Sequence, residues 1–119
     1  MITALLVVVC GGIGALARFA VDGLVQSRRL GEFPLGTFVV NIGGCLLLGL
    51  IDGLHPSHRT VLILETATIG SYTTFSTWML ETHRPAEKGE PALAWQNLAL
   101  TLVAGFIAVV IGRAIGRQI

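Results

Sequence analysis

Four long apolar blocks occupy almost the whole of this 119-residue sequence and constrain its fold more than any other feature. They run from about residue 2 to 25, 34 to 54, 60 to 83 and 91 to 116. A helix needs roughly 20 mainly apolar residues to cross the hydrocarbon core of a bilayer. Each block has that length, and together they leave no room for a soluble domain. The sequence therefore predicts a single all-α membrane domain, residues 1–119, with four transmembrane helices.

Composition and charge agree with a multi-pass protein of the cell (inner) membrane, with the lipid bilayer as its surroundings. Charged residues make up 13% of the chain and hydrophobic residues 53%, whereas a soluble domain carries about 25% charge. The net charge of +1 predicts no nucleic-acid partner. No nucleophile and base converge within the apolar blocks, so we do not expect an enzyme.

Positive charge gives the four helices almost no preferred orientation. Lys and Arg normally gather in cytoplasmic loops. An even number of crossings puts both termini on one side, with three positive residues there and four opposite. The two sets are Arg59, Arg113 and Arg117 against Arg28, Arg29, Arg84 and Lys88. We predict that copies insert both ways and pair as an antiparallel, dual-topology dimer. The alternative, that one charge orients every copy the same way, stays open.

The third apolar block contains a run of hydroxyls and aromatics, residues 66 to 78, at the depth where a helix would cross the bilayer. Hydrocarbon cannot satisfy polar groups, so such a run must line a cavity or a protein interior. Gly70 and Ser71, followed by the β-branched Thr73 and Thr74, favour local unwinding. The third helix is therefore predicted to break near its middle and to expose carbonyls that suit a hard cation.

The residues after this break could bind a small anion. Phe75 and Trp78 are three apart and share a helix face, and the weakly positive edges of aromatic rings can accept an anion. Ser76 and Thr77 add hydroxyl donors alongside. Glu81, one turn beyond, is either next to a pore or simply at the membrane interface.

Polar residues in the first two blocks have two interpretations each. Thr37 and Asn41 share a face of the second helix; they either replace part of an anion's hydration shell or form a helix-to-helix hydrogen bond. Arg18 is either a vestibule cation that attracts anions or an interfacial anchor. Pairing with Asp22, four residues on, would weaken the vestibule interpretation.

The fourth block carries a polar stripe, and small residues recur in three blocks. Asn97, Thr101 and Gly105 fall on one face of the predicted helix. Such a face is equally consistent with a pore wall and with a dimer interface. Small residues let membrane helices approach closely. Those expected to do so are Gly11, Gly12, Gly14, Gly43, Gly44, Ala108, Gly112 and Gly116.

Taken together, these motifs resemble the bacterial fluoride channels of the CrcB or Fluc family. The resemblance covers all four blocks in order, and the Thr-Thr-Phe-Ser-Thr core that follows a glycine is its most specific part. The matching segments are residues 11–15 with Arg18, residues 34–37 with Asn41, and residues 70–78 with Glu81.

The resemblance implies an antiparallel homodimer with two narrow fluoride pores and one central sodium ion. Passive export of fluoride would protect the cell against its toxicity. The implied fluoride-pore residues are Asn41, Phe75, Trp78, Ser76, Thr77, Thr37, Thr101 and Glu81. Arg18 matches the vestibule arginine, and the backbone carbonyls of Gly70 and Thr73 match the sodium ligands.

This chain departs from the family pattern at three positions. Trp78 stands in place of the second pore phenylalanine, Ser71 in place of a second glycine, and Asn97 where a tyrosine is common. Some relatives work as heterodimers, so a sister subunit is one alternative. A small multidrug exporter is another, but it would be expected to carry a mid-membrane carboxylate in its first helix, and none precedes Asp22.

Overall fold

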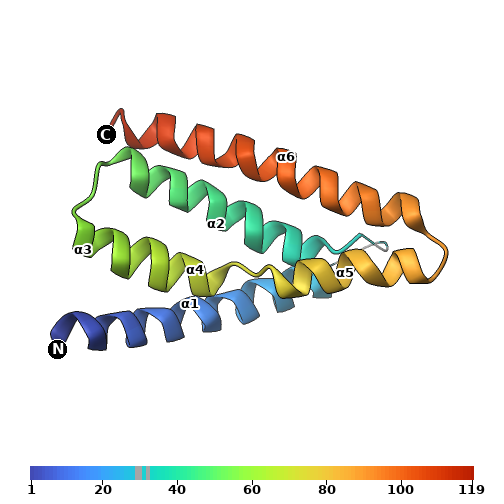
Figure 1. Ribbon diagram of the computed structural model, residues 1–119, viewed down its shortest axis with the longest axis horizontal. Coiled ribbons are helices and arrows are strands. Elements are labelled where there is room, and N and C mark those ends of the chain that lie inside the picture. The colour runs from blue at the N-terminus through green and yellow to red at the C-terminus, as the bar shows by residue number, and fades with distance from the viewer. Residues whose placement is uncertain (29–30, 32) are drawn as a thin grey trace.

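The chain folds into helices that run back and forth along one long axis (Figure 1). A computed structural model describes residues 1–28, 31 and 33–119, and they measure 49 × 30 × 23 Å. These ranges contain helices and no strands. The helices are α1 (Ile2–Ser27), α2 (Leu35–Gly53), α3 (His58–Thr60), η1 (Val61–Ile69), α4 (Gly70–Tyr72), α5 (Ser76–Glu87) and α6 (Pro91–Gly116).

Three of these helices are long and apolar enough to cross a membrane. They are α1, α2 and α6, with mean hydropathies of 2.2, 1.8 and 2.3. Pro34 immediately precedes α2 and Pro91 is the first residue of α6, because proline lacks the N–H that the first helical turn leaves unbonded. An all-helical protein with membrane-spanning helices is thus confirmed, and the three spans begin and end within about two residues of the predicted blocks.

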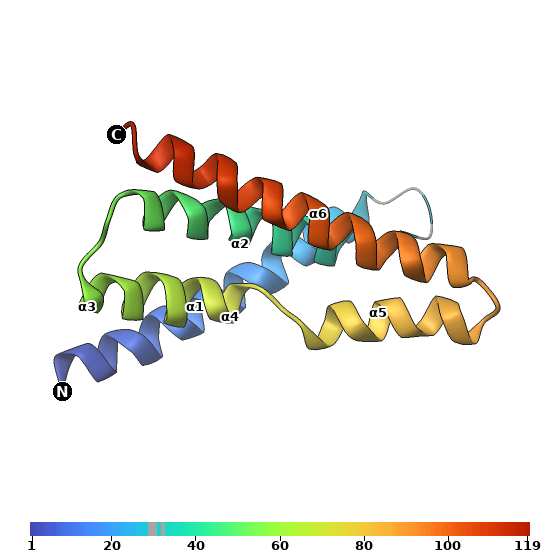
Figure 2. The ribbon, with the colours of Figure 1, turned by 45° about the horizontal axis from the view of Figure 1, so that its top comes forward.

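The third predicted block folds as several short helices. η1 is a π-helix, in which the Gly70 N–H bonds to the Glu65 carbonyl five residues back. Helical structure continues through α4 and stops at Thr73, whose backbone is extended (φ −77°, ψ 162°). α5 begins again at Ser76. Figure 2 shows the extended connection between α4 and α5 clearly.

Glycines bring α2 and α6 into backbone contact. A Cβ at Gly112 would overlap the Leu46 carbonyl oxygen, and one at Gly49 would overlap the Val109 carbonyl oxygen. Close approach increases the dispersion contacts that hold membrane helices together. The prediction of tight packing is confirmed for Gly112, while Gly49 is a contact that the sequence analysis did not name.

The glycines of α1 do not all serve one purpose. Gly14 is the one buried residue among the described residues of α1, and a Cβ there would overlap the Thr68 carbonyl oxygen of η1. Gly12 has no heavy atom within 4 Å of an added Cβ. Gly12 therefore does not pack closely against the rest of the described protomer, and close packing at this residue stays a prediction.

Both termini and the α2–α3 connection lie at one end of the molecule (Figure 1). At this end the Arg113 Nε and Asp52 Oδ2 atoms are 2.9 Å apart and join α6 to α2. The grouping of loops assumed in the charge comparison therefore agrees with the fold. Arg29, one of the residues in that comparison, lies outside the described residues.

Candidate functional site

The break between α4 and α5 is held by the side-chain amide of Asn41. Its Nδ2 donates to the Thr74 carbonyl (2.9 Å), and its Oδ1 accepts from the Thr74 N–H (2.8 Å). Asn41 is 8% exposed. The amide thus bonds to both the N–H and the C=O of Thr74, and a protein interior or membrane must satisfy such polar groups. One of its two amide N–H groups remains beyond the one that Thr74 uses.

Arg18 bonds to the same break from α1. Its Nη1 donates to the Thr73 carbonyl at 3.2 Å, and its guanidinium carbon lies 5.6 Å from the centre of the Phe19 ring. Among the described residues two ion pairs form, and neither involves Arg18. Pairing with Asp22, which would have weakened the vestibule interpretation, is therefore not seen.

A groove of about 480 Å³ brings most of the predicted site residues together. Its walls come from α2, from η1 through α5, and from α6. The predicted residues that line it are Asn41, Gly70, Thr73, Phe75, Trp78 and Thr101. Otherwise its lining is largely apolar, so the few polar groups determine where a polar solute could bind.

The two aromatic residues meet in this groove. The Phe75 and Trp78 ring centres are 5.8 Å apart with an interplanar angle of 73°, an edge-to-face arrangement. Phe75 is 69% exposed, whereas Trp78 is 8% exposed. One ring thus projects from the protomer while the other is packed inside it.

A smaller cavity of about 90 Å³ lies on the other side of Thr74. Arg18, Thr37 and Thr77 line it, and Thr74 lines both the cavity and the groove. Thr37 is 2% exposed. Thr37 and Asn41 were expected to act together, and the fold instead puts one in the cavity and the other in the groove.

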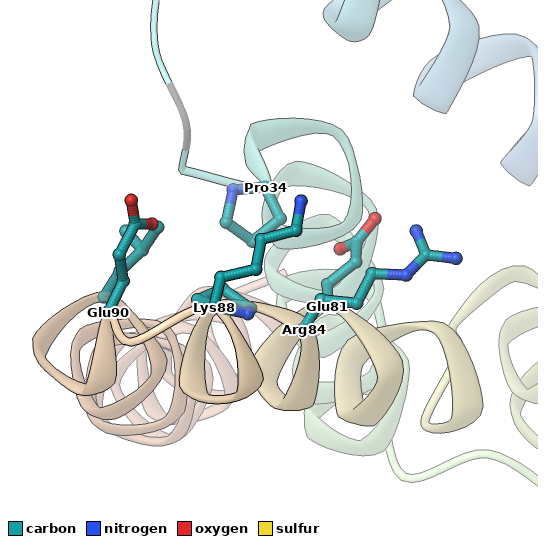
Figure 3. A pocket seen from close by; sticks show the side chains of 7 residues that line it. Pro34, Glu81, Arg84, Lys88 and Glu90 are labelled. Carbon is teal, nitrogen blue, oxygen red and sulfur yellow. The ribbon is translucent and has the colours of Figure 1, made fainter.

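Two predicted residues lie outside these spaces. Ser76 is exposed and lines neither of them. Glu81 lines an open pocket of about 290 Å³ near the connections at the other end of the chain. Figure 3 shows Glu81, Arg84, Lys88 and Glu90 extending to the same side, around Pro34.

The polar stripe of α6 faces the inside of the protomer. Asn97 is 1% exposed, and its Nδ2 donates to the Thr82 hydroxyl of α5 at 2.8 Å. The Thr82 hydroxyl in turn donates to the Trp78 carbonyl at 2.8 Å. The Thr101 hydroxyl is 3.5 Å from Asn97 Oδ1. Asn97 therefore joins two helices of one protomer.

The carbonyls at the break have the chemistry that the resemblance requires for sodium. In a continuous α-helix the Thr74 N–H would bond to the Gly70 carbonyl, but here it bonds to Asn41. The Thr73 carbonyl lies outside any helix and accepts from Arg18. Oxygen ligands of this kind suit a hard cation, so the residues fit the ion. The Arg18 charge on the Thr73 carbonyl weakens that fit.

Comparison with known proteins places the chain in one family. Residues 5–113 match the family described as "CrcB-like protein, Camphor Resistance (CrcB)". That match covers most of the sequence.

The chain belongs to the CrcB family. Its relatives include "Fluoride-specific ion channel FluC 2" of Mycolicibacterium paratuberculosis, which is 44% identical over 95% of this chain and 93% of that protein. "Fluoride-specific ion channel FluC 2" of Mycobacterium tuberculosis H37Rv is 42% identical, with 93% and 88% covered. "Fluoride-specific ion channel FluC 1" of Symbiobacterium thermophilum is 39% identical, with 93% and 94% covered. CrcB relatives are thus named as ion channels, not as enzymes.

One groove residue of this CrcB protein was missed by the sequence analysis. Glu65 lies in η1 and lines the groove, and its Oε1 is buried without a hydrogen-bond partner among the described residues. A carboxylate within an apolar block is costly at membrane depth and usually functional. That signal was available in the sequence at the centre of the third block.

Proposed function

We propose that this protein is a passive, selective fluoride channel of the cell (inner) membrane that lets cytoplasmic fluoride leave down its gradient. The observation that carries the proposal is its 44% identity, over 95% of the chain, to a protein named a fluoride-specific ion channel. Polar residues at the helix interruption support it, because they supply donors where a plain membrane helix would have none.

The proposed conducting unit is an antiparallel, dual-topology homodimer with two pores, in which the third crossing is η1 through α5. Two features of the protomer support a second copy. Phe75 projects from the protomer into an open groove. The carbonyls assigned to sodium, those of Gly70 and Thr73, also number two in one protomer, whereas a hard cation takes about six oxygen ligands.

The proposed sodium ion is structural. When bound at the dimer centre, it would offset the partial negative charge of carbonyls turned out of the helix. The Gly70 and Thr73 carbonyls of both copies would hold it. Arg18 competes for the Thr73 carbonyl, so its position bears on how strongly the cation binds.

The proposed mechanism follows from the cost of removing water from fluoride. Weak donors arranged in a narrow file can offset that cost stepwise, and each is weak enough for the ion to leave. The free amide N–H of Asn41, the hydroxyls of Thr37 and Thr77, and the ring edges of Phe75 and Trp78 are the donors we assign. The Arg18 charge would draw the anion toward the cavity.

Fluoride release from liposomes tests the proposal directly. Purified protein is reconstituted with internal potassium fluoride, and release is recorded with a fluoride electrode after valinomycin is added. We expect rapid, valinomycin-dependent release of fluoride and no release of chloride from matched liposomes. Absence of fluoride release from protein that is folded by circular dichroism would contradict a homomeric channel.

A sister subunit is the second candidate, favoured by the departures of this chain from the family pattern at Trp78, Ser71 and Asn97. Under this alternative the chain alone is silent and conducts when a second CrcB chain is added. Photobleaching steps of single fluorescently labelled particles separate the two: two steps from one chain type indicate the homodimer.

A further inference from the structure

The half-helix α5 needs a partner to fix its position, because the non-helical residues 73–75, with Thr73 extended, disconnect it from α4. α5 packs mainly against α6. It also carries Trp78, which lines the groove. Whatever fixes α5 against α6 therefore decides where this ring lies.

Within the described part of the chain, the Trp78 ring has no polar contact of its own to hold it. Its Nε1 is buried and lacks a hydrogen-bond partner among the described residues. The ring is 8% exposed, so its placement follows from packing and from the backbone of α5. That backbone is bonded at the Trp78 carbonyl, which accepts from the Thr82 hydroxyl.

The Thr82 hydroxyl connects this carbonyl to α6. It donates to Trp78 and accepts from Asn97 Nδ2, both at 2.8 Å, which are short hydrogen bonds. Asn97 is 1% exposed. Breaking the pair would leave an amide and a hydroxyl without partners in an apolar interior, which costs more than losing a bond in water.

We propose that Thr82 and Asn97 are positioning residues that set the place of Trp78 in the groove and thereby the anion selectivity of the channel. This inference rests on the proposed fluoride channel for its transport consequence. Its structural part, that the pair fixes the Trp78 ring, stands on the hydrogen bonds alone.

Threonine variants separate positioning from general stability. Thr82→Val keeps the shape and removes the hydroxyl, and Thr82→Ser restores the hydroxyl. Thr68→Val is the matched control, because the Thr68 hydroxyl donates to the Ile63 carbonyl of its own helix and not to another helix among the described residues. All three are made in a Trp95→Phe background, which leaves Trp78 as the single tryptophan of the chain.

We expect Thr82→Val to lower the initial rate of fluoride release about threefold to tenfold, in line with cross-helix hydrogen bonds in membranes, and to introduce chloride release. We expect it also to shift the Trp78 emission maximum. Thr82→Ser should restore all three properties, and Thr68→Val should leave selectivity and emission unchanged. Asn97→Leu should reproduce Thr82→Val, and the double variant should be no worse than either single change.

Two results would overturn the inference. One is equal selectivity and emission in Thr82→Val and Thr82→Ser. The other is a Thr68→Val variant that loses selectivity as Thr82→Val does. The emission measurement needs no transport, so a background protein that releases no fluoride contradicts the channel, whereas an unshifted emission contradicts the positioning pair.

Discussion

Asn41 holds the break between α4 and α5, and in the proposed channel the same side chain contacts the anion. Its amide bonds to both the N–H and the C=O of Thr74, so its rotamer is fixed without an ion. A donor that is already oriented loses little conformational entropy when it binds an ion. The alternative interpretations of Asn41, fluoride contact and helix-to-helix bond, are therefore compatible within one side chain.

Changes at Asn41 should affect stability and transport in different proportions. Asn41→Leu removes both hydrogen bonds and is expected to lower the free energy of unfolding by about 2 kcal/mol, at about 1 kcal/mol per bond. Asn41→Asp keeps the acceptor for the Thr74 N–H but has no N–H to offer. We expect both variants to lose most fluoride release and Asn41→Leu to have the lower melting temperature.

An exposed amide on α6 serves as the control for these variants. Gln96→Leu removes an amide from a side chain that is exposed and should change neither property. Normal fluoride release in Asn41→Asp would show that the amide has only a structural role.

Arg18 should oppose the binding of a cation at the break. Its Nη1 donates to the Thr73 carbonyl, and two unit charges 4 Å apart repel by about 1 kcal/mol even in water. Arg18→Gln is therefore expected to lower the sodium concentration that gives half-maximal thermal protection by at least about fivefold. Melting curves in sodium chloride, with N-methylglucamine keeping ionic strength constant, measure this.

The control for Arg18 is an arginine away from the break. Arg117 follows the end of α6, and Arg117→Gln should leave sodium protection unchanged. If Arg18→Gln also leaves it unchanged, the Thr73 carbonyl is not a cation ligand.

At the scale of elements, α2 and α6 share the most extensive helix–helix contact among the described residues. Their two backbones meet at glycines on both helices, and the membrane offers no hydrophobic effect to compensate for lost contact. Helix α1 is the opposite case, because 6% of its apolar window is buried. The α2–α6 pair therefore forms the frame against which α5 and its aromatic residue are placed.

Alanine at two glycines should show this difference. Gly112→Ala forces a Cβ onto the Leu46 carbonyl and is expected to cost about 1–3 kcal/mol of stability, as overpacking does. Gly12→Ala meets nothing within 4 Å and should be neutral or slightly stabilising, since alanine favours helix. Thermal unfolding in mild detergent compares the two, and equal melting temperatures would contradict backbone contact at Gly112.

At the scale of the whole molecule, the even charge distribution predicts two orientations in the membrane. Both termini lie at one end (Figure 1), so a label near the C-terminus reports orientation for the entire chain. Gln118→Cys in a Cys10→Ala, Cys45→Ala background provides that label. We expect an impermeant maleimide to modify about half of the molecules in intact spheroplasts.

A change in charge should shift the fraction of molecules in each orientation. Glu87→Lys adds a positive residue at the end opposite the termini, where the positive-inside rule favours the cytoplasm. Labelling of Gln118→Cys should then rise well above one half. Complete or absent labelling of the Gln118→Cys protein that lacks Glu87→Lys would contradict dual topology.

The sequence by itself determined the properties that depend on residues close together along the chain. Hydrocarbon thickness determines the length of a spanning helix, and prolines determine where α2 and α6 begin. The need to satisfy polar groups at membrane depth drew attention to the hydroxyl run around Thr73, and α4 ends just before this residue. Glu65 was equally visible by the same rule and was missed.

Only the tertiary structure decided which side chains satisfy that interruption. Asn41 and Thr74 are 33 residues apart in sequence, and Arg18 and Thr73 are 55 apart. The spacing of a single helix shows which of its residues share a face, but not which neighbouring helix that face meets. Helical spacing predicted that Asn97 and Thr101 share a face of α6. The bond from Asn97 to Thr82, however, depends on how α5 packs against α6. Periodicity is a local property, whereas the partner of a polar group depends on how the helices assemble.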